Sequence, residues 1–397
     1  MKKLGQLGKN FWPLVALKSL NWIPDSFLSM FMTSYIMRAY ANPIILVTIY
    51  NIFFSIFVFV SFYFACRFFK SASIAWIYRW GLIICIGLLA VIGVTGTDAL
   101  NFVWIMGTVY GLAIGLIALG LNYMQTSLIK NQIKFSSYRT IFGSLVKVCF
   151  PALCGFLLGQ YSYPQMAFVI LIVCLGIMLI STWIQEPPTP IQCPVFNMRK
   201  FWDTARRSKH RGAINLVLLG EFLYGSNLVL TVVQTMLIIY LFKTDLSLGL
   251  INSGLTLGLI VFRFFFGRFG SQKYFKPIFM TVLLLLFGCM GTLAWVTEFN
   301  FLVFCLCFSL ANDLLKLVYE PVTYTLFRVI PSYEKEFLAL REFWIDAGRI
   351  VLLGGLIFVA MVPNIPVGLT WYGLFLVFVF MMATIVAMLV NRRVRVS

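Results

Sequence analysis

Long apolar runs separated by short polar connections make up almost the whole chain. A helix needs about 20 apolar residues to cross a bilayer, and windows of that length predict twelve spans. The predicted spans are 11–37, 42–66, 73–95, 100–128, 138–160, 163–185, 213–241, 246–266, 276–297, 300–328, 338–361 and 368–390. The pattern therefore predicts an all-α membrane protein of twelve transmembrane helices.

The composition agrees with this prediction. Of the 397 residues, 61% are hydrophobic and 11% are charged, whereas soluble domains contain about 25% charged residues. The net charge of +18 comes from Lys and Arg scattered over short connections, so we expect no nucleic-acid partner. These residues favour alternate connections and both ends of the chain. The positive-inside rule then predicts a multi-pass protein of the cytoplasmic (plasma) membrane with both termini in the cytoplasm.

Other kinds of chemistry lack a sequence signal. Most of the nine cysteines lie in apolar runs, and the chain has a single histidine, so we expect no metal and no cofactor. No nucleophile with a neighbouring base is evident, which argues against an enzyme. A Walker A sequence is also absent, which argues against an ATP-driven pump.

A proline-rich and basic stretch at 187–212 separates the sixth span from the seventh. We expect it to be a cytoplasmic linker between an N-terminal six-helix bundle, 1–186, and a C-terminal bundle, 213–397. The segment FNMRKFWDTARR has the composition of a short amphipathic helix on the inner leaflet. A solvated tether attracted to anionic lipid explains the same charges.

The two halves resemble each other around their fourth and fifth spans. LNYMQTSLIK aligns with YEPVTYTLFR, and YRTIFGSLVK aligns with LREFWIDAGR. The second alignment pairs Arg139 with Arg341 and Lys147 with Arg349. This similarity predicts an internal duplication, as in many transporters.

Six plus six spans, cytoplasmic termini and a basic central loop resemble the major facilitator superfamily. The turn RFFFGRFGSQKYFK is similar to the family's cytoplasmic gate motif at Arg268, Gly270 and Lys273, with Gly267 replacing the usual acidic residue. REFWIDAGR resembles the YQGE-type putative transporters of Gram-positive bacteria. The resemblance implies two pseudo-symmetric six-helix bundles, a central cavity lined by the first, fourth, seventh and tenth helices, and alternating access.

Charged side chains inside the predicted spans are the candidates for function, because charge is costly in hydrocarbon. We expect substrate or proton coupling from Asp25, Lys147, Glu221, Asp313, Lys316, Glu320, Asp346 and Arg349. Two of them, Asp346 and Arg349, are close enough in sequence to neutralise each other. A self-neutralised structural cluster is the alternative for the charges of the tenth span. Arg341 and Glu342 lie nearer the inner surface, where a gate salt bridge and plain solvation are both open.

The sequence thus predicts a secondary active transporter that moves a small molecule by alternating access. Desolvation favours the neutral form of a carboxyl group, so proton coupling is chemically feasible. A lipid or glycolipid flippase of the same fold is one alternative. A non-transporting sensor or partner-binding subunit, docking through the central loop, is another. We expect the substrate, protons and the bilayer as partners, and a monomer.

Overall fold

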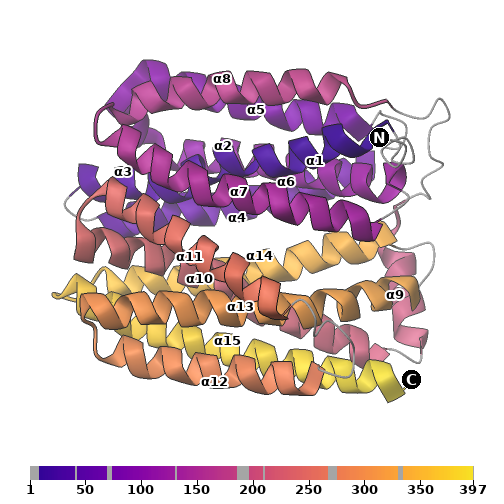
Figure 1. Ribbon diagram of the computed structural model, residues 1–397. Helices are drawn as coiled ribbons and strands as arrows, with labels where there is room; N and C mark the ends of the chain where they lie inside the picture. Colours follow the sequence, from indigo (N-terminus) through magenta and orange to yellow (C-terminus); the bar gives the residue numbers. More distant parts are fainter. Residues whose placement is uncertain are drawn as a thin grey trace. The chain divides into compact units, whose positions relative to one another are not determined.

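The computed structural model describes residues 9–40, 43–68, 74–129, 132–185, 196–208, 211–266, 275–329 and 334–396. Regular structure in these residues is helical throughout (Figure 1). The long helices are α4 (Pro43–Phe68), α5 (Ile74–Thr95), α6 (Val103–Leu128), α7 (Gln132–Leu158), α8 (Tyr163–Thr182), α10 (Arg211–Phe242), α11 (Asp245–Phe266), α12 (Phe275–Ala294), α13 (Glu298–Val329), α14 (Glu334–Val359) and α15 (Ile365–Val396). Each coincides with a predicted span.

The first predicted span is an interrupted helix. It consists of α1 (Phe11–Leu20), α2 (Trp22–Ser26), the π-helix η2 (Phe27–Phe31) and α3 (Met32–Ala39). Pro24 lies three residues before the start of the π-helical turn, and turns of this kind often mark functional sites. A further short element, the 3₁₀ helix η3 (Gly96–Phe102), joins α5 to α6.

Nine stretches of the described residues are long and apolar enough to cross a membrane. One of them, Ala75–Gln125, contains both α5 and α6. The first span is not among the nine because its pieces are short, and α14 is not among them because it carries many charges. The chain is therefore a multi-pass membrane protein.

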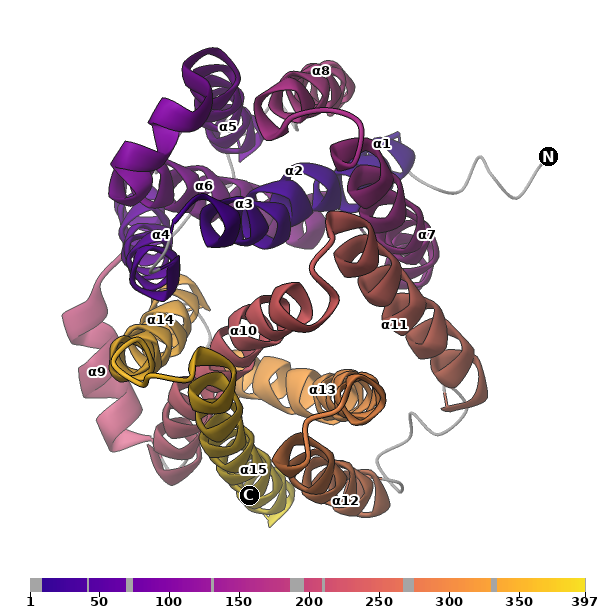
Figure 2. The same ribbon diagram turned by 90° about the vertical axis from the view of Figure 1, so that its left-hand side faces the viewer.

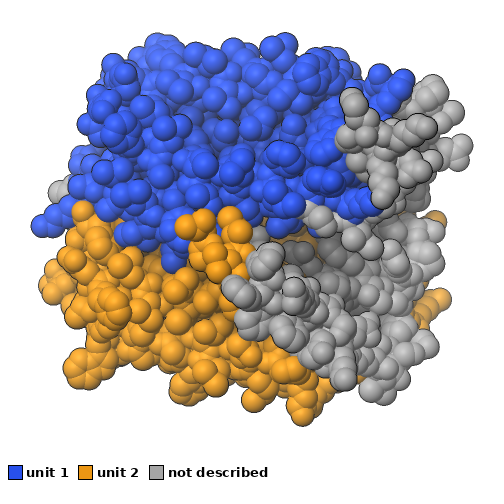
Figure 3. Space-filling view, in the orientation of Figure 1, with its two compact units in different colours: residues 1–193, 243–256 blue, residues 194–242, 257–397 orange. Residues whose placement is uncertain are grey.

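The helices gather into two compact units (Figure 3). Unit 1 consists of residues 1–193 and 243–256, and unit 2 consists of 194–242 and 257–397. The first turns of α11 thus group with unit 1, which the sequence does not indicate. The predicted bundle limits, 1–186 and 213–397, stay a prediction.

Within unit 1, α6 packs between α4 and α5, α5 packs on α8, and α1 packs on α7. The contact between α4 and α6 depends on glycine, because a Cβ at Gly111 would collide with the carbonyl oxygen of Phe54. Small residues at such crossings let membrane helices approach closely.

Within unit 2, α10 packs on both α14 and α15, and α12 packs on α13 and α15. Figure 2 shows α12 and α13 of this unit more nearly end on than Figure 1 does. A short helix outside the predicted spans, α9 (Met198–Arg207), contacts α10 and α14. This packing places the charged helices α10, α13 and α14 next to one another.

Candidate functional site

Asp25 is held in unit 1 by a buried tyrosine. The hydroxyl of Tyr110 on α6 donates to the Asp25 carboxylate at 2.6 Å and also reaches the Asp25 carbonyl oxygen at 3.2 Å. Tyr50 on α4 donates to the carbonyl of Leu28, one turn further along the interrupted helix, at 2.7 Å. Two phenols from neighbouring helices therefore fix the broken part of the first span, where the backbone ladder is irregular.

Lys147 lies close to this carboxylate. Its ammonium nitrogen is 3.4 Å from the centre of the Trp22 ring, a cation–π contact between α7 and α2. Its charge also acts on Asp25, which follows Trp22 by three residues. The structure therefore brings together the two candidates of unit 1, Asp25 and Lys147, and adds Trp22 to them.

Lys18 belongs to the same region, and sequence reasoning missed it. Its ammonium group donates to the side-chain oxygen of Gln125 and, at 3.3 Å, to that of Asn122, both on α6. The charge of Arg139 on α7 acts on it as well. The signal that could have found it is its place one helical turn before Trp22, on the same face.

In unit 2, Glu221 of α10 and Arg341 of α14 form an ion pair. The guanidinium Nε donates to the Glu221 carboxylate at 2.8 Å. The Glu221 side chain is 0% exposed and that of Arg341 is 20% exposed. A residue predicted for coupling is thus paired with one predicted for the gate, and the charge of Glu342 also acts on Glu221.

Two glycines set the register that allows this pair. A Cβ at Gly225 would lie 2.7 Å from the carbonyl oxygen of Ile345, and one at Gly348 would collide with that of Phe222. Because neither residue has a side chain, α10 and α14 cross in close contact. Glu221 lies one turn before Gly225, and the register of this crossing puts it beside Arg341.

Asp346 and Arg349 form the local pair that their spacing allows. Arg349 Nη1 is 2.6 Å from Asp346 Oδ1, with the side chains 15% and 2% exposed. Two further atoms of this pair are buried, Oδ2 of Asp346 and Nε of Arg349. Among the described residues, Oδ2 accepts no hydrogen bond and Nε donates none. This pair therefore retains capacity for a further polar group.

The charges of α13 are only partly described. Asp313 is buried and Lys316 is half-buried on this helix. Next to Asp313, Asn312 accepts a hydrogen bond from the hydroxyl of Tyr224 on α10 at 3.0 Å. The side chain of Glu320 lies outside the described residues, as do the predicted gate residues Arg268, Gly270 and Lys273.

No family model matches the chain, and no curated protein matches it. Solved structures do. A peptide transporter of the POT type in complex with sulfate has a TM-score of 0.68 at 12% identity, covering 97% of this chain and 95% of its own. A bacterial homologue of the iron transporter ferroportin, in an inward-facing state, has a TM-score of 0.66 at 15% identity, covering 97% and 98%. A bacterial homologue of the human lysosomal transporter Spinster has a TM-score of 0.64 at 13% identity, covering 96% of each chain.

The chain has the major facilitator fold. The expected fold class is therefore confirmed over nearly the full length. At 12–15% identity the likeness concerns the fold alone, so the role of each charged residue has to be argued from the geometry above.

Proposed function

We propose that this protein is a secondary active transporter that moves a small molecule by alternating access, with protons as the coupling ion. The observation that carries the proposal is the pair between Glu221, which is 0% exposed, and Arg341 on a different helix. A buried charge of this kind is costly in a membrane protein, so a residue that carries one usually has a function. Protonation of Glu221 would remove its charge, release Arg341 and change the free energy of the α10–α14 contact.

Unit 1 supports the proposal from the substrate side. Lys18 donates hydrogen bonds to the side-chain amides of Asn122 and Gln125 on α6, whereas Lys147 lies over the indole ring of Trp22 and its charge acts on Asp25. An anionic group of a substrate forms stronger hydrogen bonds with an ammonium group than a neutral amide does. We infer that Lys18 binds such a group, while Asp25, beside the charge of Lys147, responds to the proton.

The remaining details of the proposal follow from the sequence. The basic connections support cytoplasmic termini in a plasma membrane, and REFWIDAGR supports a place near the YQGE-type transporters. Asp313, Lys316, Glu320 and the pair of Asp346 with Arg349 are assigned to the same coupling machinery. We propose that Arg268, Gly270, Lys273 and Glu342 act at the cytoplasmic gate, and that the transporter is a monomer.

Purified protein in liposomes with an imposed pH gradient tests this function. A pH-sensitive dye inside the liposomes reports proton movement while pools of amino acids, peptides, nucleosides, sugars and organic acids are supplied in turn. We expect one pool to move protons with the unchanged protein. Glu221→Gln and Asp25→Asn should lose accumulation against a gradient but keep downhill exchange of the same compounds.

The control is Glu298→Gln, which removes an exposed acid at the start of α13. It should transport like the unchanged protein. Accumulation that survives both Glu221→Gln and Asp25→Asn would contradict proton coupling. If no pool moves and a fluorescent lipid crosses the bilayer instead, the flippase alternative replaces small-molecule transport.

A further inference from the structure

The helix α9, in the segment between the sixth and seventh spans, belongs to unit 2 and packs against α14. The backbone N–H of Asn197 donates to the Glu336 carboxylate of α14 at 2.7 Å. The buried ring of Phe201 lies 6.1 Å from the ring of Phe337, centre to centre. Residues 198–207 therefore form a helix that packs against α14.

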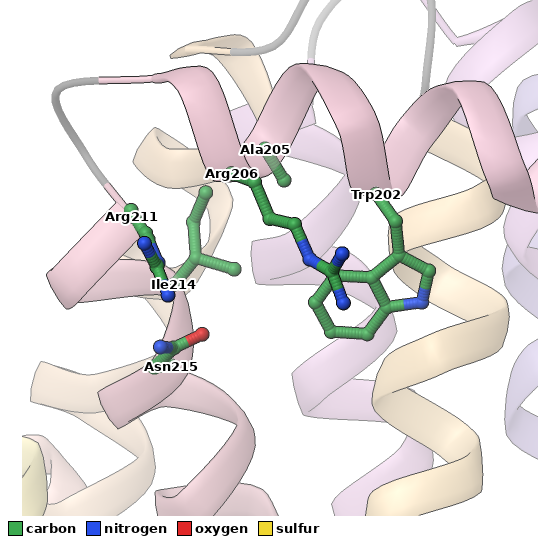
Figure 4. Close-up of a pocket in the computed structure, with 6 residues that line it drawn as sticks. All are labelled: Trp202, Ala205, Arg206, Arg211, Ile214 and Asn215. Carbon is green, nitrogen blue, oxygen red and sulfur yellow. The ribbon is translucent and has the colours of Figure 1, made fainter.

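A pocket of about 200 Å³ lies between α9 and the start of α10. It is lined by Trp202, Ala205, Arg206, Arg211, Ile214 and Asn215 (Figure 4). Trp202 and Arg206 are four residues apart on α9, and Arg211 and Asn215 are four residues apart on α10, so each helix presents one polar face to the pocket. Ala205 and Ile214 are buried and supply apolar surface.

The lining of the pocket includes two arginines, Arg206 and Arg211, and no acidic residue. Within the described part of the chain, neither Arg206 nor Arg211 takes part in an ion pair. Asp203, the acid nearest in sequence, is exposed on α9 and forms no ion pair with them. A third guanidinium is close by, because Arg393 of α15 lies against the backbone of Gly212.

The donors in this pocket suit a phosphate group. Arginine presents parallel N–H groups that match two phosphate oxygens, and the Asn215 amide adds two further donors. A carboxylate would also accept from arginine, but a membrane surface offers phosphate at far higher density. Basic pockets beside transmembrane helices on the cytoplasmic side are typical binding sites for phospholipid headgroups.

The position along the helix agrees with a headgroup. Arg211 begins the apolar stretch Arg211–Phe242, which is long enough to cross the bilayer. The end of such a stretch lies at the level of the headgroups. Trp202 is partly exposed, and tryptophan is enriched at this depth because its ring is apolar and its N–H is polar.

We propose that the α9–α10 pocket binds a phosphate ester, and that its occupant is the headgroup of an anionic phospholipid. Arg206 and Arg211 bind the phosphate oxygens, Asn215 donates a further hydrogen bond, and Trp202 contacts the glycerol and the upper acyl chain. The lipid thereby links the linker helix to the first helix of the second half. This proposal goes beyond transport and does not depend on the identity of the cargo.

The experiment measures lipid binding to the full-length protein in detergent. Short-chain phosphatidylglycerol and phosphatidylcholine are titrated, and bound lipid is counted by native mass spectrometry. We expect Arg206→Gln combined with Arg211→Gln to raise the Kd for phosphatidylglycerol at least about tenfold, because the charge-assisted hydrogen bonds of both guanidinium groups to the phosphate are lost. Phosphatidylcholine binding should change less.

A matched control carries the same change of charge, with both substitutions on α9. Arg199 and Arg207 are exposed on α9 and do not line the pocket. Arg199→Gln combined with Arg207→Gln should leave the Kd within about twofold, because long-range attraction alone is small in salt. An equal loss in both double variants would overturn the pocket in favour of diffuse attraction, and no loss in either would overturn it altogether.

Two further arms identify the occupant and guard against misfolding. Inorganic phosphate and glycerol 3-phosphate are added as competitors. If either competitor displaces the lipid at a concentration close to the Kd measured for phosphatidylglycerol, a soluble phosphate compound is the occupant. The lipid assignment then fails. Brominated phosphatidylglycerol should quench part of the tryptophan fluorescence of the unchanged protein, and Trp202→Phe should reduce this quenching. Equal quenching in the two proteins would contradict the proposed contact.

Discussion

Asp25 in unit 1 and Glu221 in unit 2 both lie on the first helix of their half of the chain, yet their partners differ. Asp25 accepts a hydrogen bond from the neutral phenol of Tyr110, at 2.6 Å. Glu221 accepts one from the guanidinium of Arg341, at 2.8 Å. A phenol can bind either form of a carboxyl group, whereas a guanidinium favours the charged form. The two units therefore hold these two acids in different ways.

The same difference extends to the basic residues. Lys18 of unit 1 donates hydrogen bonds to side-chain amides, while Arg349 of unit 2 is paired with Asp346. Neutral partners can be exchanged for a ligand at little cost, but a buried ion pair cannot lose one member without exposing the other to an apolar surrounding. We infer that Lys18 adapts unit 1 to substrate binding, and that Asp25 and Glu221, one in each unit, respond to the proton.

The largest expected effect is the loss of the buried ion pair. Glu221→Ala leaves the guanidinium of Arg341 without its acid, and breaking a buried pair costs about 3–5 kcal/mol. We expect a loss of that order in the free energy of unfolding, measured in detergent by denaturant titration. Adding Arg341→Met should recover much of the loss.

If Glu221→Ala is no more harmful than the exposed Glu298→Ala, the two units do not differ in the proposed way. A double variant that is worse than Glu221→Ala alone would show that Arg341 has another essential partner.

A second effect concerns the crossing that sets the register of this pair. Gly348→Ala places a methyl group on the carbonyl oxygen of Phe222, and overpacking of this kind costs about 1–3 kcal/mol. The thermal midpoint in detergent should fall. Gly354→Ala on the same helix meets no atom within 4 Å and should leave the midpoint unchanged or raise it. Equal effects of the two variants would exclude the close crossing.

A smaller effect is expected at the acid of unit 1. Tyr110→Phe removes the donor to Asp25, which is half-buried, but the carboxyl group can take up a proton instead of remaining charged. We expect a loss of about 1 kcal/mol in unfolding free energy, measured beside Tyr161→Phe, whose ring is exposed. A loss as large as that of Glu221→Ala would remove the contrast between the units.

The smallest effect is expected at the edge of unit 1, where Arg38 pairs with Asp245 at 3.1 Å. The Arg38 side chain is 42% exposed, and pairs of this kind contribute about 0.2–1 kcal/mol. Arg38→Gln should lower the thermal midpoint slightly at low salt and not at all at high salt. A large effect that persists in salt would mean that unit 1 also depends on an ion pair.

The helices of this protein could be predicted from hydropathy, because each span must satisfy its own backbone hydrogen bonds within the bilayer. The pairing of Glu221 with Arg341 could not. It depends on the register between α10 and α14, which Gly225 and Gly348 set through a contact of backbones. Glycine is frequent in membrane helices, so the sequence does not distinguish these two from glycines such as Gly354.

The site of unit 1 was predictable only in part. Asp25 and Lys147 stand out because they are charged residues in apolar runs. Lys18 does not stand out, since a lysine near the end of a span commonly reaches the headgroups with its flexible stem. Trp22 does not stand out either, because it carries no charge. The packing of α2 against α7 brings Trp22 and Asp25 to the same neighbourhood as Lys147.

The π-helical turn also affects how this chain should be compared with other proteins. Its i to i+5 hydrogen bonds accommodate one more residue than an α-helical turn does. Residues before Phe27 are therefore out of step with those after Phe31 by one position. An alignment of the first helix to an uninterrupted homologue needs a one-residue gap here, and without that gap Asp25 would be matched to a position that faces a different direction.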